Sequence, residues 1–182
     1  MTAVLDDSTL AVRIAQYLTE QTGQPVTVGN VRRFPVGFSW LTYLVPVQGL
    51  EPGGATRDLI LRLGPDYGLF APYSADPQVR AMQSLEGSGV PHPRAFWHSD
   101  DATLFGAPFM FCEKVSGSAV VPWVSPSEPP LPDDLRKRLG TQFIDALAAL
   151  HRVHWQDKPI ASMGEGITAE NAARINVEQW DA

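Results

Sequence analysis

The sequence predicts an α+β fold in which an antiparallel sheet of about five strands precedes a helical region. Three observations indicate this class. Short β-type segments follow one another with brief connections, helical periodicity flanks the first of them, and a proline-rich stretch at 122–134 precedes the longest helix. Parallel strands need crossovers of about a dozen residues or more, so short connections favour antiparallel hairpins.

The first element is a helix over about residues 9–21. Ser8 is a suitable N-cap, and Gly23 followed by Pro25 would end the helix. Apolar residues recur at i, i+4, i+7 and i+8, which is typical of one helix face; they are Leu10, Ile14, Tyr17 and Leu18.

Three β-type segments follow this helix. Residues 26–34 and 41–47 are rich in β-branched and aromatic residues, and a turn-rich loop at 49–57 leads into residues 58–63. The near-continuous apolar run of 58–63 predicts a strand buried on both faces.

A second helix is expected after Asp76, which is suited to the N-cap, with Pro77 at the first helical position. Its apolar stripe consists of Val79, Met82 and Leu85. Two glycines then end the helix. Residues 90–101 and 104–115 are the last two predicted strands.

The longest helix is expected over about residues 133–154, and a short helix starting at Thr168 lies within the tail 156–182. The long helix carries an apolar stripe made of Leu135, Leu139, Phe143, Leu147 and Leu150. A stripe of this size must pack on something, so the helix is not a spacer in solvent.

Composition narrows the function classes. The 182 residues are 44% hydrophobic and 19% charged, as in ordinary globular proteins, and no apolar run approaches the roughly 18 residues that cross a bilayer. Acidic residues stand where a signal peptide would be basic, so a cytoplasmic location is expected. The net charge of −6 argues against nucleic-acid binding. The single cysteine, Cys112, is expected to be buried, not to act as a nucleophile.

Two features are candidates for anion binding. The turn 36–39 holds Gly37, where a backbone can approach a phosphate closely, and Ser39, whose hydroxyl can add a contact; a ligand-free hairpin turn is the alternative. Arg62 ends an otherwise apolar strand, where a buried charge needs a partner. That partner is a phosphate or a carboxylate, unless the side chain reaches water.

Other chemistries have less support. His151 and His154 have a spacing that can hold a metal, but no acidic or cysteine ligand stands at a matching distance, and a core histidine is the alternative. Ser39 lacks the second glycine of a nucleophile elbow. His92 and His98 have no motif around them.

Taken together, five segments resemble the aminoglycoside phosphotransferase and choline-kinase-like family, over about residues 10–155. They are FPVGFSWLTYLV (34–45), DLILRLGP (58–65), LEGSGVPHPRAFW (85–97), FGAPFMFCEKVSG (105–117) and FIDALAALHRVHW (143–155). The resemblance implies a kinase-like nucleotide-binding N-lobe over 1–117, a proline-rich linker over 118–132, and the start of an incomplete helical C-lobe over 133–182.

The family's binding residues can be matched position by position. The resemblance assigns the loop over the phosphates to Gly37, Phe38 and Ser39, the cation of the basic strand to Arg62, and the adenine-pairing backbone atoms to the Glu113 carbonyl and the Val115 N–H. Cys112 matches the residue at the back of the adenine pocket. ATP and Mg²⁺ are the implied cofactors, and a small-molecule hydroxyl is the implied acceptor in a complete protein.

Two departures from the family pattern stand out. Gln78 occupies the position where the family often has a glutamate that pairs with the strand cation; Gln78 can hydrogen-bond Arg62 but cannot neutralise it. The family's catalytic His-Gly-Asp loop and metal-binding aspartate have no counterpart, because Asp157 and Asp181 lack the required neighbours. We therefore expect no catalytic residue and no metal ligand in these residues, and no activity from them alone.

Three functions remain open from the sequence. The first is the N-terminal part of an ATP-dependent small-molecule phosphotransferase, as a truncated or split gene product. The second is a non-catalytic nucleotide-binding or interaction module that acts with a partner chain, and the third is a metal- or small-ligand-binding α+β protein. An exposed 135–150 helix face would also favour self-association.

Overall fold

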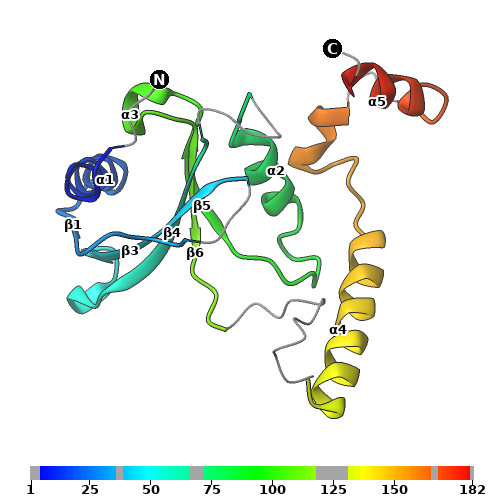
Figure 1. Cartoon of the computed structure of the whole chain (residues 1–182), viewed down its shortest axis with the longest axis horizontal. Helices are drawn as coiled ribbons and strands as arrows, with labels where there is room; N and C mark the ends of the chain where they lie inside the picture. The colour runs from blue at the N-terminus through cyan, green and yellow to red at the C-terminus, as the bar shows by residue number, and fades with distance from the viewer. Residues whose placement is uncertain (1–4, 36–38, 66–71, 118–130, 165–167, 181–182) are drawn as a thin grey trace.

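The computed structural model describes residues 5–35, 39–65, 72–117, 131–164 and 168–180. Its described residues form an α+β fold with one antiparallel sheet, as the sequence predicts (Figure 1). The sheet has the order β1-β3-β4-β6-β5, and β2 also pairs with β3. The strands are β1 (Thr27–Val28), β2 (Arg32–Arg33), β3 (Leu41–Gln48), β4 (Arg57–Leu63), β5 (Ala95–Ser99) and β6 (Phe109–Glu113).

Helices lie on both faces of this sheet and beyond it (Figure 1). Among the described residues they are α1 (Asp7–Thr22), α2 (Asp76–Ser84), the short α3 (Ala102–Phe105), α4 (Asp133–His151) and α5 (Ala172–Trp180), with 3₁₀ turns η1 (Pro52–Gly54) and η2 (Pro159–Gly164). None of the helices in these residues is both long and apolar enough to cross a membrane.

The central strand β4 separates two apolar clusters. Leu59, Leu61 and Leu63 are buried on the face covered by α1, where they meet Phe105, Phe109 and Phe111. The opposite face of the sheet meets α2 through a smaller cluster of Trp40, Ala75, Val79, Met110 and Cys112. Ile60 is only partly buried there, so the prediction of a strand fully buried on both faces holds for one face alone.

The start of α1 differs from the prediction. Asp6, not Ser8, is the N-cap, and its carboxylate accepts the backbone N–H groups of Ser8 at 3.1 Å and Thr9 at 3.0 Å. The Ser8 hydroxyl also donates to Asp6, and this hydrogen bond lowers the Asp6 pKa below its usual range. A carboxylate near a helix N-terminus is further favoured by the helix dipole.

The short helix α3 was not predicted. The Asp101 carboxylate accepts the Thr103 N–H at 2.9 Å, and Gly106 ends the turn in the left-handed conformation at φ 83°. Strand β6 therefore begins at Phe109, later than the expected 104.

The two outer strands of the sheet are irregular. Between the pairs Val28↔Val47 and Arg32↔Leu44, the first segment holds one residue more than β3. The single predicted strand 26–34 is therefore two short strands with a bulge between them. At the other edge, β5 shifts register between Ala95 and His98.

Helix α4 begins at Asp133 as expected and ends at His151, three residues before the predicted end. It stands apart from the sheet (Figure 1). None of its residues is buried within the described chain; Phe143, Leu147 and Leu150 are 67%, 37% and 45% exposed. The chain then returns, and η2 lies against α2.

Candidate nucleotide site

A recess of about 500 Å³ opens between β3, β4 and the start of α2. Its wall contains the two anion-binding candidates that the structure describes, Ser39 and Arg62. The other lining residues are Trp40, Pro72, Tyr73, Ser74, Pro77 and Gln78. Three separate stretches of the sequence therefore meet at one concave place, with a cation in its wall.

Arg62 lies on the face of β4 that α1 does not cover. One guanidinium nitrogen donates to Gln78 Oε1 at 2.8 Å, and the guanidinium carbon lies 5.5 Å from the centroid of the Trp40 ring. Burial lowers the pKa of Arg62, but an arginine keeps its proton in proteins. No carboxylate pairs with Arg62 within the described ranges, so its charge is not neutralised there.

The family resemblance placed Gln78 where it could hydrogen-bond Arg62 without neutralising it, and the structure shows this hydrogen bond. The amide oxygen of Gln78 orients the guanidinium through one hydrogen bond and carries no charge. An arginine held by a neutral partner in a partly buried wall is suited to an anion, because an uncompensated charge in such a place is costly. A phosphate group would supply both the charge and the acceptor oxygens.

Trp40 and Tyr73 are residues that the sequence reasoning missed. Trp40 is buried directly before β3, and its ring meets the Tyr73 ring edge-on at a centroid distance of 5.4 Å. The Tyr73 hydroxyl is buried and has no hydrogen-bond partner among the described residues. The sequence signal that could have pointed to Trp40 was an aromatic residue between Gly37 and the predicted strand 41–47.

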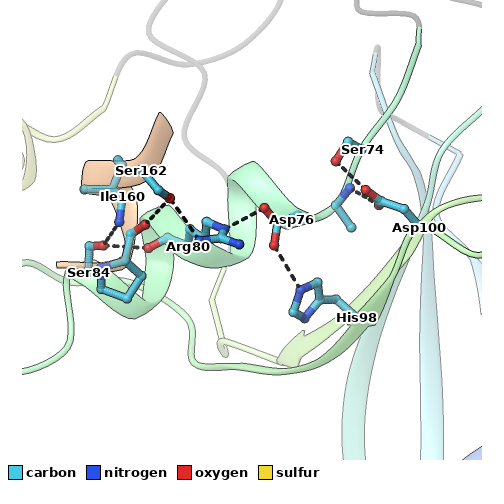
Figure 2. A network of polar contacts seen from close by, with 10 residues as sticks. Ser74, Asp76, Arg80, Ser84, His98, Asp100, Ile160 and Ser162 are labelled. Atoms are coloured by element: carbon cyan, nitrogen blue, oxygen red, sulfur yellow. Dashed lines mark hydrogen bonds and ion pairs between the residues drawn. The ribbon is translucent and has the colours of Figure 1, made fainter. Parts of the chain in front are cut away.

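A polar network fixes α2, which carries Gln78 (Figure 2). At its start, the Asp100 carboxylate accepts the Ala75 N–H at 2.7 Å and the Ser74 hydroxyl at 2.6 Å. Asp76, predicted to be the N-cap, is instead the first helical residue, and Ala75 precedes it as the cap. The cap was missed because the carboxylate that binds it comes from 25 residues along the chain.

The same network continues along the helix (Figure 2). The Asp76 carboxylate accepts Arg80 Nε at 2.6 Å and lies 3.6 Å from His98 Nε2. Its pKa is lowered, chiefly by the hydrogen bond from Arg80. At the far end, buried Ser84 accepts the Ile160 N–H of η2 at 3.0 Å. Helix α2 is thus tied to β5 and to η2.

The candidate adenine-pairing residues lie farther along the sheet. In the sheet, Arg62 lies opposite Met110, and Leu59 lies opposite Glu113. Three residues of strand, or about 10 Å, therefore separate Glu113 from the level of Arg62. The Glu113 N–H donates to the Arg94 carbonyl at 2.8 Å. Val115 is exposed, and its N–H has no partner in the described part of the chain. Gly37 and Phe38 lie outside the described residues.

Cys112 is buried beneath this edge, as predicted. Burial raises the pKa of its thiol, and the nearby Arg62 acts in the opposite direction. The thiol therefore stays protonated at neutral pH, which suits a packing role.

Metal binding has no support in this part of the chain. Among the described residues, no three histidine, cysteine, aspartate or glutamate side chains are grouped so that they could hold a metal ion. The lining of the recess offers the hydroxyls of Ser39, Tyr73 and Ser74, an arginine and an amide, and this set does not fit Mg²⁺, which prefers carboxylate oxygens. The set does fit a phosphate.

Comparisons with known proteins identify the family of the chain. The model of the Phosphotransferase enzyme family matches residues 30–180, and the chain belongs to that family. A crystal structure from Ralstonia eutropha JMP134, described as a "putative aminoglycoside phosphotransferase", is 23% identical with a TM-score of 0.54. The alignment covers 81% of this chain and 39% of that one, so this chain spans about two fifths of that protein's length. No curated protein gave a significant match.

Proposed function

We propose that this chain provides the nucleotide-binding lobe of an ATP-dependent phosphotransferase whose acceptor is a hydroxyl group of a small molecule. The observation that carries the proposal is the recess that Arg62 and Ser39 both line, where no carboxylate of the described residues pairs with Arg62. The Val115 N–H, just beyond the end of β6, has no partner within the described residues, which supports a place for the adenine ring.

In this proposal each group has a separate task. Arg62 binds phosphate oxygens, the Ser39 hydroxyl and the backbone near Gly37 add contacts to them, and the Glu113 carbonyl with the Val115 N–H pairs with the base. Phosphoryl transfer depends mainly on positioning and charge stabilisation. These residues can position a nucleotide, but the described ones offer no group of metal ligands. We therefore propose that the 182 residues alone do not catalyse transfer.

Binding of ATP to matched arginine variants tests this function. Arg57→Met is the control for Arg62→Met, because Arg57 lies on the same strand but pairs with Glu51 at 3.0 Å and stacks on Phe96. Charge-assisted hydrogen bonds contribute about 1.5–3 kcal/mol, so Arg62→Met should weaken ATP binding roughly 10- to 150-fold. Arg57→Met should leave it unchanged.

Two results would contradict the proposal. Equal ATP affinity in the wild-type and Arg62→Met chains would remove Arg62 from the site. Steady ATP hydrolysis or transfer by the purified chain, with Mg²⁺ and no second protein present, would refute the proposed inactivity.

A second candidate function is a non-catalytic module that acts with a partner chain. The exposed apolar residues of α4 favour it, because a face with Phe143, Leu147 and Leu150 in water promotes association. A nucleotide affinity that appears only when a second chain is bound would support this candidate over the first.

A further inference from the structure

We infer that Gln78 is a positioning residue that orients Arg62 while leaving its full positive charge for a bound anion. The inference rests on the proposed function, since it concerns the same recess. It goes beyond that function in giving a reason for a neutral side chain at this position: the site gains affinity for phosphate at the expense of stability.

Gln78 can fix the orientation of the Arg62 guanidinium without changing the charge of the site. Gln78 Oε1 accepts one N–H of the Arg62 guanidinium at 2.8 Å. The guanidinium carbon lies 5.5 Å from the centroid of the Trp40 ring. A guanidinium has five N–H donors in a planar fork, so one accepted bond leaves others for phosphate oxygens. A glutamate would make the same bond but would add a negative charge next to any phosphate.

The electrostatic surroundings agree with this division. Burial lowers the pKa of Arg62, and among the titratable groups that the structure describes only the Cys112 thiol acts on this pKa in the opposite direction; that thiol is protonated at neutral pH. The nearest acidic residue on α2, Asp76, is engaged by Arg80 and His98. The charge of Arg62 is therefore not offset within the described residues that line the recess.

The position of Gln78 is itself well defined. The next residue on α2, Val79, is buried in the cluster with Trp40, and Asp100 holds the helix start through the Ala75 N–H. Because the helix is held at its start (Figure 2) and packed beside Gln78, the amide oxygen reaches Arg62 from a fixed backbone.

Two variants of Gln78 are expected to change thermal stability in opposite directions. Gln78→Glu would turn the hydrogen bond into a partly buried ion pair, so thermal stability should rise while anion affinity falls about tenfold or more. Gln78→Met keeps the length of the side chain without its acceptor, so both stability and affinity should fall. If Gln78 were merely a packing residue, stability and affinity would change in the same direction in both variants.

The experiment titrates metal-free ATP and inorganic tripolyphosphate into the wild-type, Gln78→Glu, Gln78→Met and Arg62→Met chains by calorimetry, with melting temperatures measured in parallel. In the Arg62→Met background, Gln78→Glu should lower affinity by a smaller factor than in the wild-type chain, because no arginine charge is left to be neutralised and only the repulsion between the added carboxylate and phosphate remains. Arg57→Met is again the control. A rise in melting temperature with a loss of binding in Gln78→Glu is the expected result.

The outcomes distinguish a failure of the proposed function from a failure of the role inferred for Gln78. If the wild-type chain responds to neither probe, the proposed function fails, and the inference fails with it. If the wild-type chain binds and Arg62→Met does not, but Gln78→Glu binds as tightly as wild type or is destabilised, the proposed function stands and the inference is overturned.

Discussion

Removal of the Ser84 hydroxyl should release η2 from α2. Ser84 is 2% exposed, and its Oγ donates to the Arg80 carbonyl at 2.7 Å and accepts the Ile160 N–H at 3.0 Å. In Ser84→Ala the Arg80 carbonyl keeps its helical partner, but the Ile160 N–H loses its acceptor. A buried donor without a partner costs about 1–3 kcal/mol, and the better helix propensity of alanine returns about 0.5 kcal/mol. The net loss should be about 0.5–2.5 kcal/mol.

Amide hydrogen exchange at Ile160 measures this loss directly. A change of about 0.5–2.5 kcal/mol in the local opening equilibrium corresponds to an exchange rate that is roughly 2- to 70-fold faster. Ser88→Ala is the matched control, because Ser88 Oγ donates to the Leu85 carbonyl at 2.6 Å and accepts the Val90 N–H at 3.1 Å without touching η2. In that variant the Ile160 amide should exchange as in wild type.

Two results would refute this reasoning. Free exchange of the Ile160 amide in the wild-type protein would mean that η2 does not dock on α2 in solution. Faster exchange at Ile160 in Ser88→Ala by the same factor would mean that the loss comes from the end of the helix and not from the Ser84 hydroxyl.

Three further predictions concern charge, surface and packing. Hydrogen bonding from Arg80 lowers the pKa of Asp76, so the contribution of Asp76 to stability is present above the ordinary carboxyl pKa and is lost as pH falls through its folded-state pKa. Asp76→Asn should therefore reduce the fall in melting temperature between pH 6 and pH 2. An unchanged fall would exclude this contribution of Asp76. Phe143→Ser combined with Leu147→Ser should reduce concentration-dependent association in light scattering, whereas equal association would exclude the α4 face as its cause. Cys112 should react with iodoacetamide only on unfolding, since it is buried and protonated; rapid labelling of the folded chain at pH 7.5 would show that the edge of the sheet opens.

The sequence predicted the elements whose burial follows a regular period. The stripe of α1 and the positions of β3 and β4 agree with the structure, because side chains recur on one helix face and alternate on a strand; β4, predicted from its apolar run to be buried on both faces, is fully buried on one. The four residues of α3 are too few to show a period, and the prediction assigned 102–103 to a turn and 104–105 to the start of a strand. The bulge between β1 and β2 depends on register with β3, which a single segment does not reveal.

In the candidate site, the sequence indicated only the contact between two positions that the family resemblance links. The hydrogen bond from Arg62 to Gln78 was expected from the resemblance, and it is present. The Trp40–Tyr73 contact and the cap supplied by Asp100 were not expected, since each joins residues brought together only by the tertiary fold. The roles of Ser39, Glu113 and Val115 in binding stay predictions.

The irregular outer strands have a consequence for how this protein meets other chains. A long, flat outer strand presents a row of free N–H and C=O groups to which a foreign strand can add, and bulges interrupt such a row. Here one edge is divided between β1 and β2, and β5 at the other edge has a register shift. Amyloid-like growth by strand addition is therefore disfavoured at both ends of the sheet, and we expect aggregates of this chain to retain its native β content in infrared spectra.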